Sequence, residues 1–164
     1  MGILSTILGK KKNETPAICD VDLERYLGTW YEIARYPHRF EEGLDNVTAN
    51  YTLRSDGKIQ VINSGLKNGE RKEAKAVATV PDKKCTGKLL VSFFWPLKGE
   101  YRVIRLGKDY DYVVVTSSTM DYLWILSRQP KISKDVSDDL TAFVSSKGYD
   151  LEKIIWVKQD KNES

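Results

Sequence analysis

His38 is the one histidine among the 164 residues, and it follows Pro37 with carboxylates at Glu41 and Glu42 close behind. A histidine beside an acid is the base of a Ser–His–acid catalytic set, which also requires an activated serine or cysteine. No nucleophile motif stands near His38 in the sequence. We therefore predict no catalytic residue and interpret His38 as a rim residue, with an enzyme kept as the alternative to a binding protein.

The two cysteines, Cys19 and Cys85, are too few for a disulfide-stapled scaffold. The sequence leaves open whether they form a bridge or stay free thiols, because their geometry in the fold decides that. One histidine and no close cysteine pair give no basis for a zinc or haem site. We predict no metal site and no cofactor.

The charges are numerous but scattered, with 26 basic and 23 acidic side chains and a net charge of +3. Clusters such as Arg71-Lys72 and Lys83-Lys84 fall where turns and strand ends are expected, so we predict no nucleic-acid partner. A chain of this length forms one domain. No apolar run approaches the roughly 18 residues of a membrane-spanning helix.

Eight apolar-rich segments are separated by turn signals such as Asp56-Gly57 and Asn68-Gly69. Their connections are short, so sequential neighbours should pair antiparallel. We predict an all-β fold in which an eight-stranded up-and-down sheet closes into a barrel, wide enough to be filled by side chains or to hold one small ligand. The segments are 29–36, 47–54, 58–64, 73–80, 88–95, 101–106, 110–117 and 122–128.

One segment breaks the period of two. Between Ser133 and Ser146, apolar side chains recur at helical spacing, and Gly148 provides a stop. We predict one C-terminal α-helix packed outside the barrel on Val136, Leu140, Phe143 and Val144. A short helical lead-in is expected at 22–27 and a further strand at 151–157.

Aromatic and polar side chains on predicted inward faces suggest a ligand cavity, because a few polar groups among apolar ones are typical of binding sites. Alanines on the first and fourth strands, including the Ala74, Ala76 and Ala78 stripe, leave room beside them. The predicted ligand-binding residues are Ala34, Tyr36, Tyr51, Asn63, Phe93, Tyr101 and Trp124.

Three motifs resemble, in order, the signature regions of the lipocalin family. They are Gly28-x-Trp30 before the first strand, Met120-Asp121-Tyr122 before the last strand, and Arg128 at its end. The stretches 26–35, 91–94 and 121–128 are similar to bacterial lipocalins of the outer-membrane lipoprotein type, which are related to apolipoprotein D. The resemblance covers about residues 20 to 158.

This resemblance implies structural roles for Gly28, Trp30, Asp121, Tyr122 and Arg128, with Trp30 closing the base of the barrel under the Arg128 guanidinium. It also implies that Tyr51, Asn63, Tyr101 and Trp124 line the ligand cavity, in agreement with their inward parity. We expect a tail at 1–19, a lipocalin barrel at 20–158 and a tail at 159–164.

The expected function is the binding and transport or storage of a hydrophobic ligand, such as a fatty acid or lysophospholipid, in membrane maintenance or stress response. The alternative is a lipocalin-fold enzyme acting on a lipid-like substrate. The expected partners are that ligand and a membrane surface, and both a monomer and a homodimer stay open.

The resemblance suggests the cell envelope, either the outer membrane or the periplasm. The segment Gly2–Leu8 is weakly apolar and precedes Lys10-Lys11-Lys12, the reverse of the order in a secretory signal. Cys19 follows these lysines and the stretch 14–18, which departs from the lipid-anchor pattern of the bacterial proteins. The stretch as written therefore predicts neither a signal peptide nor a lipid anchor.

Overall fold

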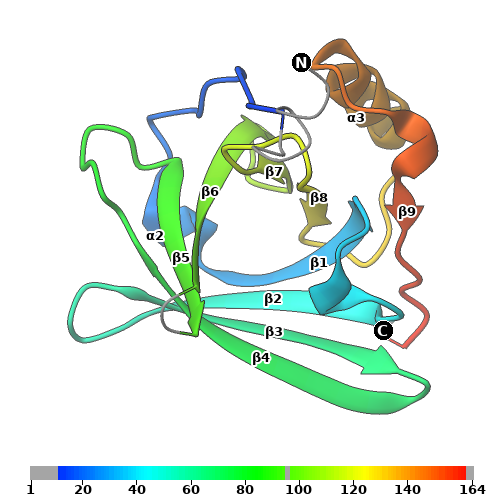
Figure 1. The fold of residues 1–164 in the computed structure, drawn as a ribbon, viewed down its shortest axis with the longest axis horizontal. Coiled ribbons are helices and arrows are strands. Elements are labelled where there is room, and N and C mark those ends of the chain that lie inside the picture. Colours follow the sequence, from blue (N-terminus) through cyan, green and yellow to red (C-terminus); the bar gives the residue numbers. More distant parts are fainter. Residues whose placement is uncertain (1–10, 95–96, 162–164) are drawn as a thin grey trace, which may run out of the picture.

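Eight strands form a closed antiparallel barrel, as predicted. The computed structural model describes residues 11–94 and 97–161, and the side chains of residues 93–98 lie outside that description. Each strand pairs with the next, and β1 pairs with both β2 and β8, which closes the ring (Figure 1). The strands are β1 (Gly28–Arg35), β2 (Asp45–Leu53), β3 (Ile59–Lys67), β4 (Glu70–Thr79), β5 (Lys88–Phe94), β6 (Leu97–Leu106), β7 (Tyr112–Thr116) and β8 (Leu123–Ser127).

The elements differ from the predicted ones mainly at their ends. The sixth strand, expected at 101–106, begins earlier, at Leu97, so Lys98 and Gly99 lie within β6. The strand expected at 151–157 is only β9 (Ile155–Trp156), which pairs with the end of β1 and follows the short 3-10 helix η2 (Leu151–Lys153). The lead-in helix is α2 (Leu23–Tyr26), capped by the Asp22 side chain, which accepts from two backbone N–H groups.

The predicted helix is α3 (Lys134–Ser146), and it packs outside the ring of strands (Figure 1). The Ser133 hydroxyl caps it by accepting from the backbone N–H of Val136. Leu140 and Val144 are fully buried, and Val136 and Phe143 pack beside them. None of the helices in the described part of the chain is long and apolar enough to cross a membrane.

The barrel wall separates two apolar clusters. The interior cluster includes Trp30 and Tyr51, and the exterior cluster lies under α3. On β8 the alternation is clean, since Trp124 and Leu126 belong to the interior and Leu123 and Ile125 to the exterior. On β4, Ala76 and Ala78 are buried in the interior, whereas Ala74 is exposed.

A bulge in β1 overturns part of the predicted ligand set. The register with β8 shifts between Glu32 and Ala34, so Glu32 lies opposite the interior residue Leu126, but Ala34 lies opposite the exterior residue Ile125. An extra residue in one strand exchanges the two faces beyond it. The expectation that Ala34 and Tyr36 face the cavity is therefore wrong, because both side chains pack in the exterior cluster.

The closed base of the barrel is built on Trp30, which is completely buried. The Arg128 guanidinium lies over its ring at 3.8 Å and donates to the backbone carbonyls of Arg25, Tyr26 and Thr29, at 2.7, 3.1 and 3.0 Å. The cation over the ring and its carbonyl partners join α2, β1 and the end of β8.

The close approach of Arg128 to the backbone requires a glycine at position 28. Its φ is +102°, and a Cβ there would stand 3.2 Å from the nearest guanidinium nitrogen of Arg128. The two other signature residues lie at the opposite end, where Asp121 is exposed and Tyr122 is half-buried.

The segment 11–21 runs along the outside of the barrel. Cys19 and Cys85 form a disulfide, which answers the question that the sequence left open. Next to the bridge, the backbone N–H of Ile18 donates to the carbonyl of Val103 at 2.8 Å, and that of Thr86 donates to Cys19 at 3.0 Å. This part of the predicted 1–19 tail is integrated into the fold.

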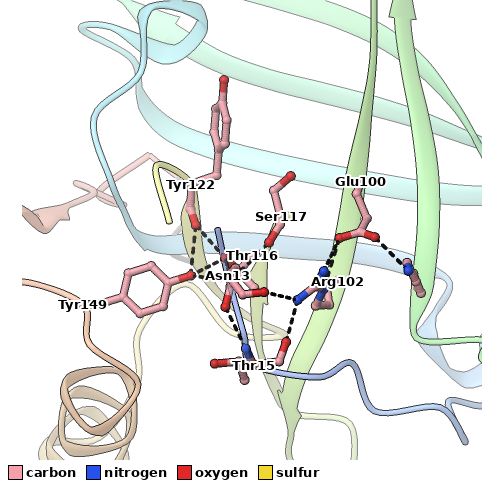
Figure 2. A network of polar contacts seen from close by, with 9 residues as sticks. Asn13, Thr15, Glu100, Arg102, Thr116, Ser117, Tyr122 and Tyr149 are labelled. Carbon is pink, nitrogen blue, oxygen red and sulfur yellow. Dashed lines mark hydrogen bonds and ion pairs between the residues drawn. The ribbon is translucent and has the colours of Figure 1, made fainter. Parts of the chain in front are cut away.

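Asn13 holds the beginning of that segment (Figure 2). Its buried amide donates to the Thr116 hydroxyl, the Ser117 carbonyl and the Tyr149 hydroxyl at 2.9, 3.1 and 3.0 Å. The Arg102 side chain donates to the Asn13 carbonyl at 3.0 Å. The amide thus joins the N-terminal segment, the end of β7 and the chain after α3.

Truncation of Trp30 tests the closure of the base. Trp30→Ala should lower the free energy of unfolding by about 3–5 kcal/mol, because a large buried aromatic and its cation partner are lost. Trp156→Ala is the matched control, since Trp156 is 50% exposed and surface changes cost roughly 0.5 kcal/mol or less. Equal denaturant midpoints for the two variants would contradict the closure role.

Candidate functional site

The end of the barrel opposite Trp30 is where interior side chains remain accessible. Trp124 lies at this end beside Arg35, and Asn63 stands on the inner face of β3; both are half-buried. Tyr51 and Tyr101 lie nearer the base, where both contact Tyr26. The structure thus brings four predicted ligand-binding residues onto the inner wall. The Phe93 side chain lies outside the described residues.

Three tyrosines form a polar floor below this open half. The Tyr101 hydroxyl is hydrogen-bonded to that of Tyr26 and, at 3.0 Å, to that of Tyr51. Burial raises the pKa of Tyr51 to about 12 and raises the pKa values of Tyr26 and Tyr101 well above their ordinary value. All three therefore stay uncharged phenols and present hydroxyl groups to the interior.

A cluster of charged side chains stands at the open end. The β1–β2 loop, which contains the 3-10 helix η1 (Arg39–Glu41), turns the Glu41 carboxylate toward the barrel. One oxygen of Glu41 accepts from Trp124 Nε1 at 2.9 Å and lies 2.8 Å from His38 Nε2. Arg35 Nη1 donates to the Glu32 carboxyl at 2.9 Å and lies 3.7 Å from the other oxygen of Glu41.

The bulge in β1 explains why these charges are inside. Glu32 and Arg35 are three residues apart, yet both reach the interior, because the bulge lies between them. Arg35 pairs across the strands with Trp124, so their side chains leave the sheet on the same face. Both charged side chains are only 3% exposed.

The pKa values of Glu32 and Glu41 are shifted in opposite directions. Burial, with the nearby charge of Glu41, raises the pKa of Glu32 well above its ordinary value, and Arg35 offsets this only in part. Burial alone would also raise the pKa of Glu41, but hydrogen bonds from His38, Glu32 and Trp124 outweigh it and lower that pKa to about 2. Burial thus favours the protonated form of Glu32, whereas hydrogen bonds favour the ionised form of Glu41.

The hydrogen bonding agrees with this assignment. Oε2 of Glu41 is buried and has no hydrogen-bond partner. A hydrogen bond between the carboxyl groups of Glu32 and Glu41 requires a proton on one of them. The cluster thus places the Arg35 guanidinium and the His38 ring on the two oxygens of Glu41.

His38 lies at the rim, as predicted. Its ring contacts those of Phe40, Tyr122 and Trp124, with centroids 6.1, 5.9 and 5.5 Å away. In the part of the chain that the structure describes, no hydroxyl or thiol is hydrogen-bonded to His38, and no group of three His, Cys, Asp or Glu side chains is placed to hold a metal. A hollow of about 430 Å³ beside the loop is lined by Arg35, His38, Arg39, Glu42 and Ile155, among others.

The sequence analysis did not identify Glu32, Arg35 and Glu41 as residues of the barrel interior. The position of Glu32 could have been predicted, since it shares the alternation parity of Trp30 and therefore stands on an interior face. Arg35 has the opposite parity to Trp30, so only the bulge reveals it.

The comparison with models of protein families assigns this barrel to a family. A family model described as a lipocalin-like domain matches residues 21–159. The chain belongs to the lipocalin family. The matched range includes Gln159, whose buried amide donates to the carbonyls of Glu32 and Val47 at 2.9 and 2.8 Å. Gln159 therefore belongs to the folded barrel and not to the tail predicted at 159–164.

Individual proteins agree with this assignment. The lipocalin is 50% identical to the outer membrane lipoprotein Blc of Citrobacter freundii over 84% of this chain and 79% of that protein. It is 33% identical to apolipoprotein D of Mus musculus over 96% of this chain and 90% of that protein. Among solved structures, insecticyanin from the tobacco hornworm Manduca sexta has the same fold, with a TM-score of 0.75 and 23% sequence identity. The superposition covers 91% of this chain and 86% of insecticyanin.

The protonation of Glu32 predicts how stability depends on pH. A carboxyl whose pKa is raised on folding stabilises the protein fully below its unfolded pKa, near 4.3, and loses that contribution as pH rises through the folded value. Glu32→Gln imitates the protonated acid. Its free energy of unfolding relative to the parent should therefore increase from pH 4.5 to pH 8, by more than about 1 kcal/mol.

Denaturant unfolding at both pH values measures this difference. Glu42→Gln is the matched control, because Glu42 is exposed and its variant should follow the parent. Glu41 titrates in the opposite sense and below this window, since its pKa is about 2. Parallel curves for the parent and Glu32→Gln would show that Glu32 is ionised in the folded protein.

Proposed function

We propose that this lipocalin binds and carries a hydrophobic ligand, a fatty acid, lysophospholipid or similar amphiphile, with its chain inside the open half of the barrel. The observation that carries the proposal is the accessible inner wall of Trp124 and Asn63 above the floor of three tyrosines and the packed base. Each methylene that leaves water contributes about 0.8 kcal/mol. Such burial is non-directional, so it favours long chains with little selectivity among them.

Membership of the lipocalin family and the names of the relatives support a lipid-related role. One relative is named an outer membrane lipoprotein and another an apolipoprotein. From these names we infer that the protein serves the cell envelope, in membrane maintenance or the response to stress. The disulfide supports this location, because such bonds persist mainly in oxidising compartments.

Contact with a membrane surface is a further part of the proposal. Phe40 on the β1–β2 loop is 55% exposed, and Ile155 and Trp156 on β9 are 39% and 50% exposed. Both elements adjoin the open end, since β9 pairs with the last residues of β1. Exposed aromatic and aliphatic side chains beside the opening would let a ligand pass from a lipid layer without crossing bulk water.

The same geometry disfavours the alternative of a lipocalin-fold enzyme. His38 is engaged by Glu41, whose other partner is the indole of Trp124. A general base needs a nucleophile within hydrogen-bond reach. The nearest neighbours of the His38 ring that the structure describes are aromatic rings and a carboxylate, which supports binding rather than catalysis.

Fluorescence of Trp124 tests the proposed function. Titration with a long-chain fatty acid or lysophospholipid should quench tryptophan emission, and Trp124→Phe should remove most of the quenching because this indole faces the interior. Trp156→Phe is the control, since Trp156 stands outside on β9. Full quenching in Trp124→Phe, with an unchanged far-ultraviolet spectrum, would place the ligand elsewhere.

A pair of variants separates the inner wall from the rim. Asn63 lies between Ala49 and Ala74 on the inner face, so Asn63→Leu changes a surface that the ligand would touch. Arg39 is exposed on the loop, where a charge adds little affinity. Arg39→Ala should therefore change the Kd by less than about tenfold, and by less than Asn63→Leu, when both are titrated with one labelled fatty acid. A collapse of binding in Arg39→Ala alone would instead locate recognition at the rim.

A further inference from the structure

The N-terminal segment meets the barrel at its open end. The backbone N–H of Met120 donates to the carbonyl of Lys11 at 2.8 Å, and Lys12 pairs with Thr119 in an isolated antiparallel bridge. Residues 119 and 120 belong to the loop that joins β7 to β8, and β8 runs from this loop toward Arg128 at the base. The chain that precedes Lys11 therefore begins beside the mouth of the barrel.

On one side, this exit is joined to the chain that follows α3. The buried Asn13 amide donates to the Tyr149 hydroxyl at 3.0 Å (Figure 2). Tyr149 leads into η2 and β9, where Leu151, Ile155 and Trp156 are 42%, 39% and 50% exposed. The contact through Asn13 thus connects the N-terminal segment to the part of the chain that carries these apolar side chains.

On the other side, the exit adjoins the β1–β2 loop. The loop between β7 and β8 ends at Tyr122, whose ring lies 5.9 Å from that of His38, measured between centroids. Phe40 follows on the same loop and is 55% exposed. Because β9 pairs with the last residues of β1, the exit and the exposed apolar side chains lie on one part of the rim. We call Phe40, Leu151, Ile155 and Trp156 the mouth face.

The charge at the exit has one sign. Lys10, Lys11 and Lys12 are consecutive, and residues 1–12 contain no acidic side chain. Lys11 and Lys12 are exposed. The neighbouring loops, η2 and β9 instead carry exposed charges of both signs, namely Arg39, Lys153 and Lys158 with Glu42, Asp121, Asp150, Glu152 and Asp160. The positive surplus is therefore at the exit, and an anionic lipid surface is the partner that complements it.

The sequence before the lysines is apolar. Residues 2–8 lie outside the described part of the structure, and four of these seven residues are isoleucine or leucine, at positions 3, 4, 7 and 8. An apolar segment followed by a basic cluster combines two membrane-binding signals. Attachment through one such signal is marginal and reversible, and stable attachment generally requires two.

We propose that residues 2–12 and the mouth face hold the barrel on an anionic lipid bilayer by non-covalent contacts, with its opening toward the lipid. The apolar segment inserts between lipids and the lysines lie at the head groups. The mouth face meets the membrane interface, a position that favours tryptophan. This inference rests on the proposed function, because it names the partner of the membrane contact and the segment that selects it.

The test measures sedimentation with vesicles of phosphatidylcholine, either alone or mixed with an equal share of phosphatidylglycerol. The unaltered protein should bind the anionic vesicles at least about tenfold more tightly, because each lysine near such a surface adds to the attraction. Lys11→Gln/Lys12→Gln should lose most of this preference. Lys83→Gln/Lys84→Gln, the matched control, removes the same charge from two exposed lysines between β4 and β5, at the base, and should keep it.

The orientation has a readout of its own. Vesicles with brominated acyl chains should quench Trp156, so the quenching should fall in Trp156→Phe. Deletion of residues 2–8 should weaken binding to both kinds of vesicle while fatty acids still quench Trp124. Unchanged vesicle binding after the deletion, or unchanged bromine quenching in Trp156→Phe, would contradict the proposed attachment.

Two further results would overturn the inference. One is equal binding of the two vesicle types by the unaltered protein, and the other is an equal loss of preference in the two double lysine variants. A dimer that the deletion of residues 2–8 abolishes, without vesicle binding, would assign the mouth face to a second copy of the chain. Fatty-acid quenching without vesicle binding would overturn this inference alone, whereas the absence of fatty-acid quenching would overturn the proposed function.

Discussion

The contact between the Arg128 guanidinium and the Trp30 ring is the constraint on which the rest of the barrel depends. It lies where the first and last strands of the ring meet, and its carbonyl partners fix the lead-in helix to the same point. A sheet that closes on itself has no free edges to satisfy. The positive φ of Gly28 is the local cost of bringing the backbone so near to the arginine. With this end sealed, only the opposite end is available for exchange with the surroundings.

β1 then determines the chemistry of that opposite end. Its first half places Trp30 in the base, and its bulge sends Ala34 outward under α3 while Arg35 turns inward beside Trp124. The same irregularity therefore supplies both a site for the helix to pack and a buried cation. That cation is tolerated because the carboxyl groups of Glu32 and Glu41 lie 2.9 and 3.7 Å from it. Packing outside the barrel and electrostatics inside it are coupled through one extra residue.

The sequence predicts the barrel and α3 well, because alternation, turn residues and helical periodicity are local signals. Leu140 and Val144, for example, are buried as their spacing indicates. The site is predicted less well. Tyr51 and Trp124 follow strict alternation, whereas Arg35 follows the bulge, which no residue type in β1 announces. The inward turn of Glu41 depends on a contact between residues 83 positions apart, which lies beyond the reach of local patterns.

Asn13 has a consequence for the order in which the chain folds. Its amide contacts Thr116 and Tyr149 across sequence separations of 103 and 136 residues. Contacts that close such long loops lose much chain entropy and form after local ones. The strand hairpins can pair before the C-terminal residues are synthesised, but this junction cannot form until Tyr149 is present. The outer fastening of the N-terminal segment is therefore a late event that depends on residues about 100 positions or more further along the chain.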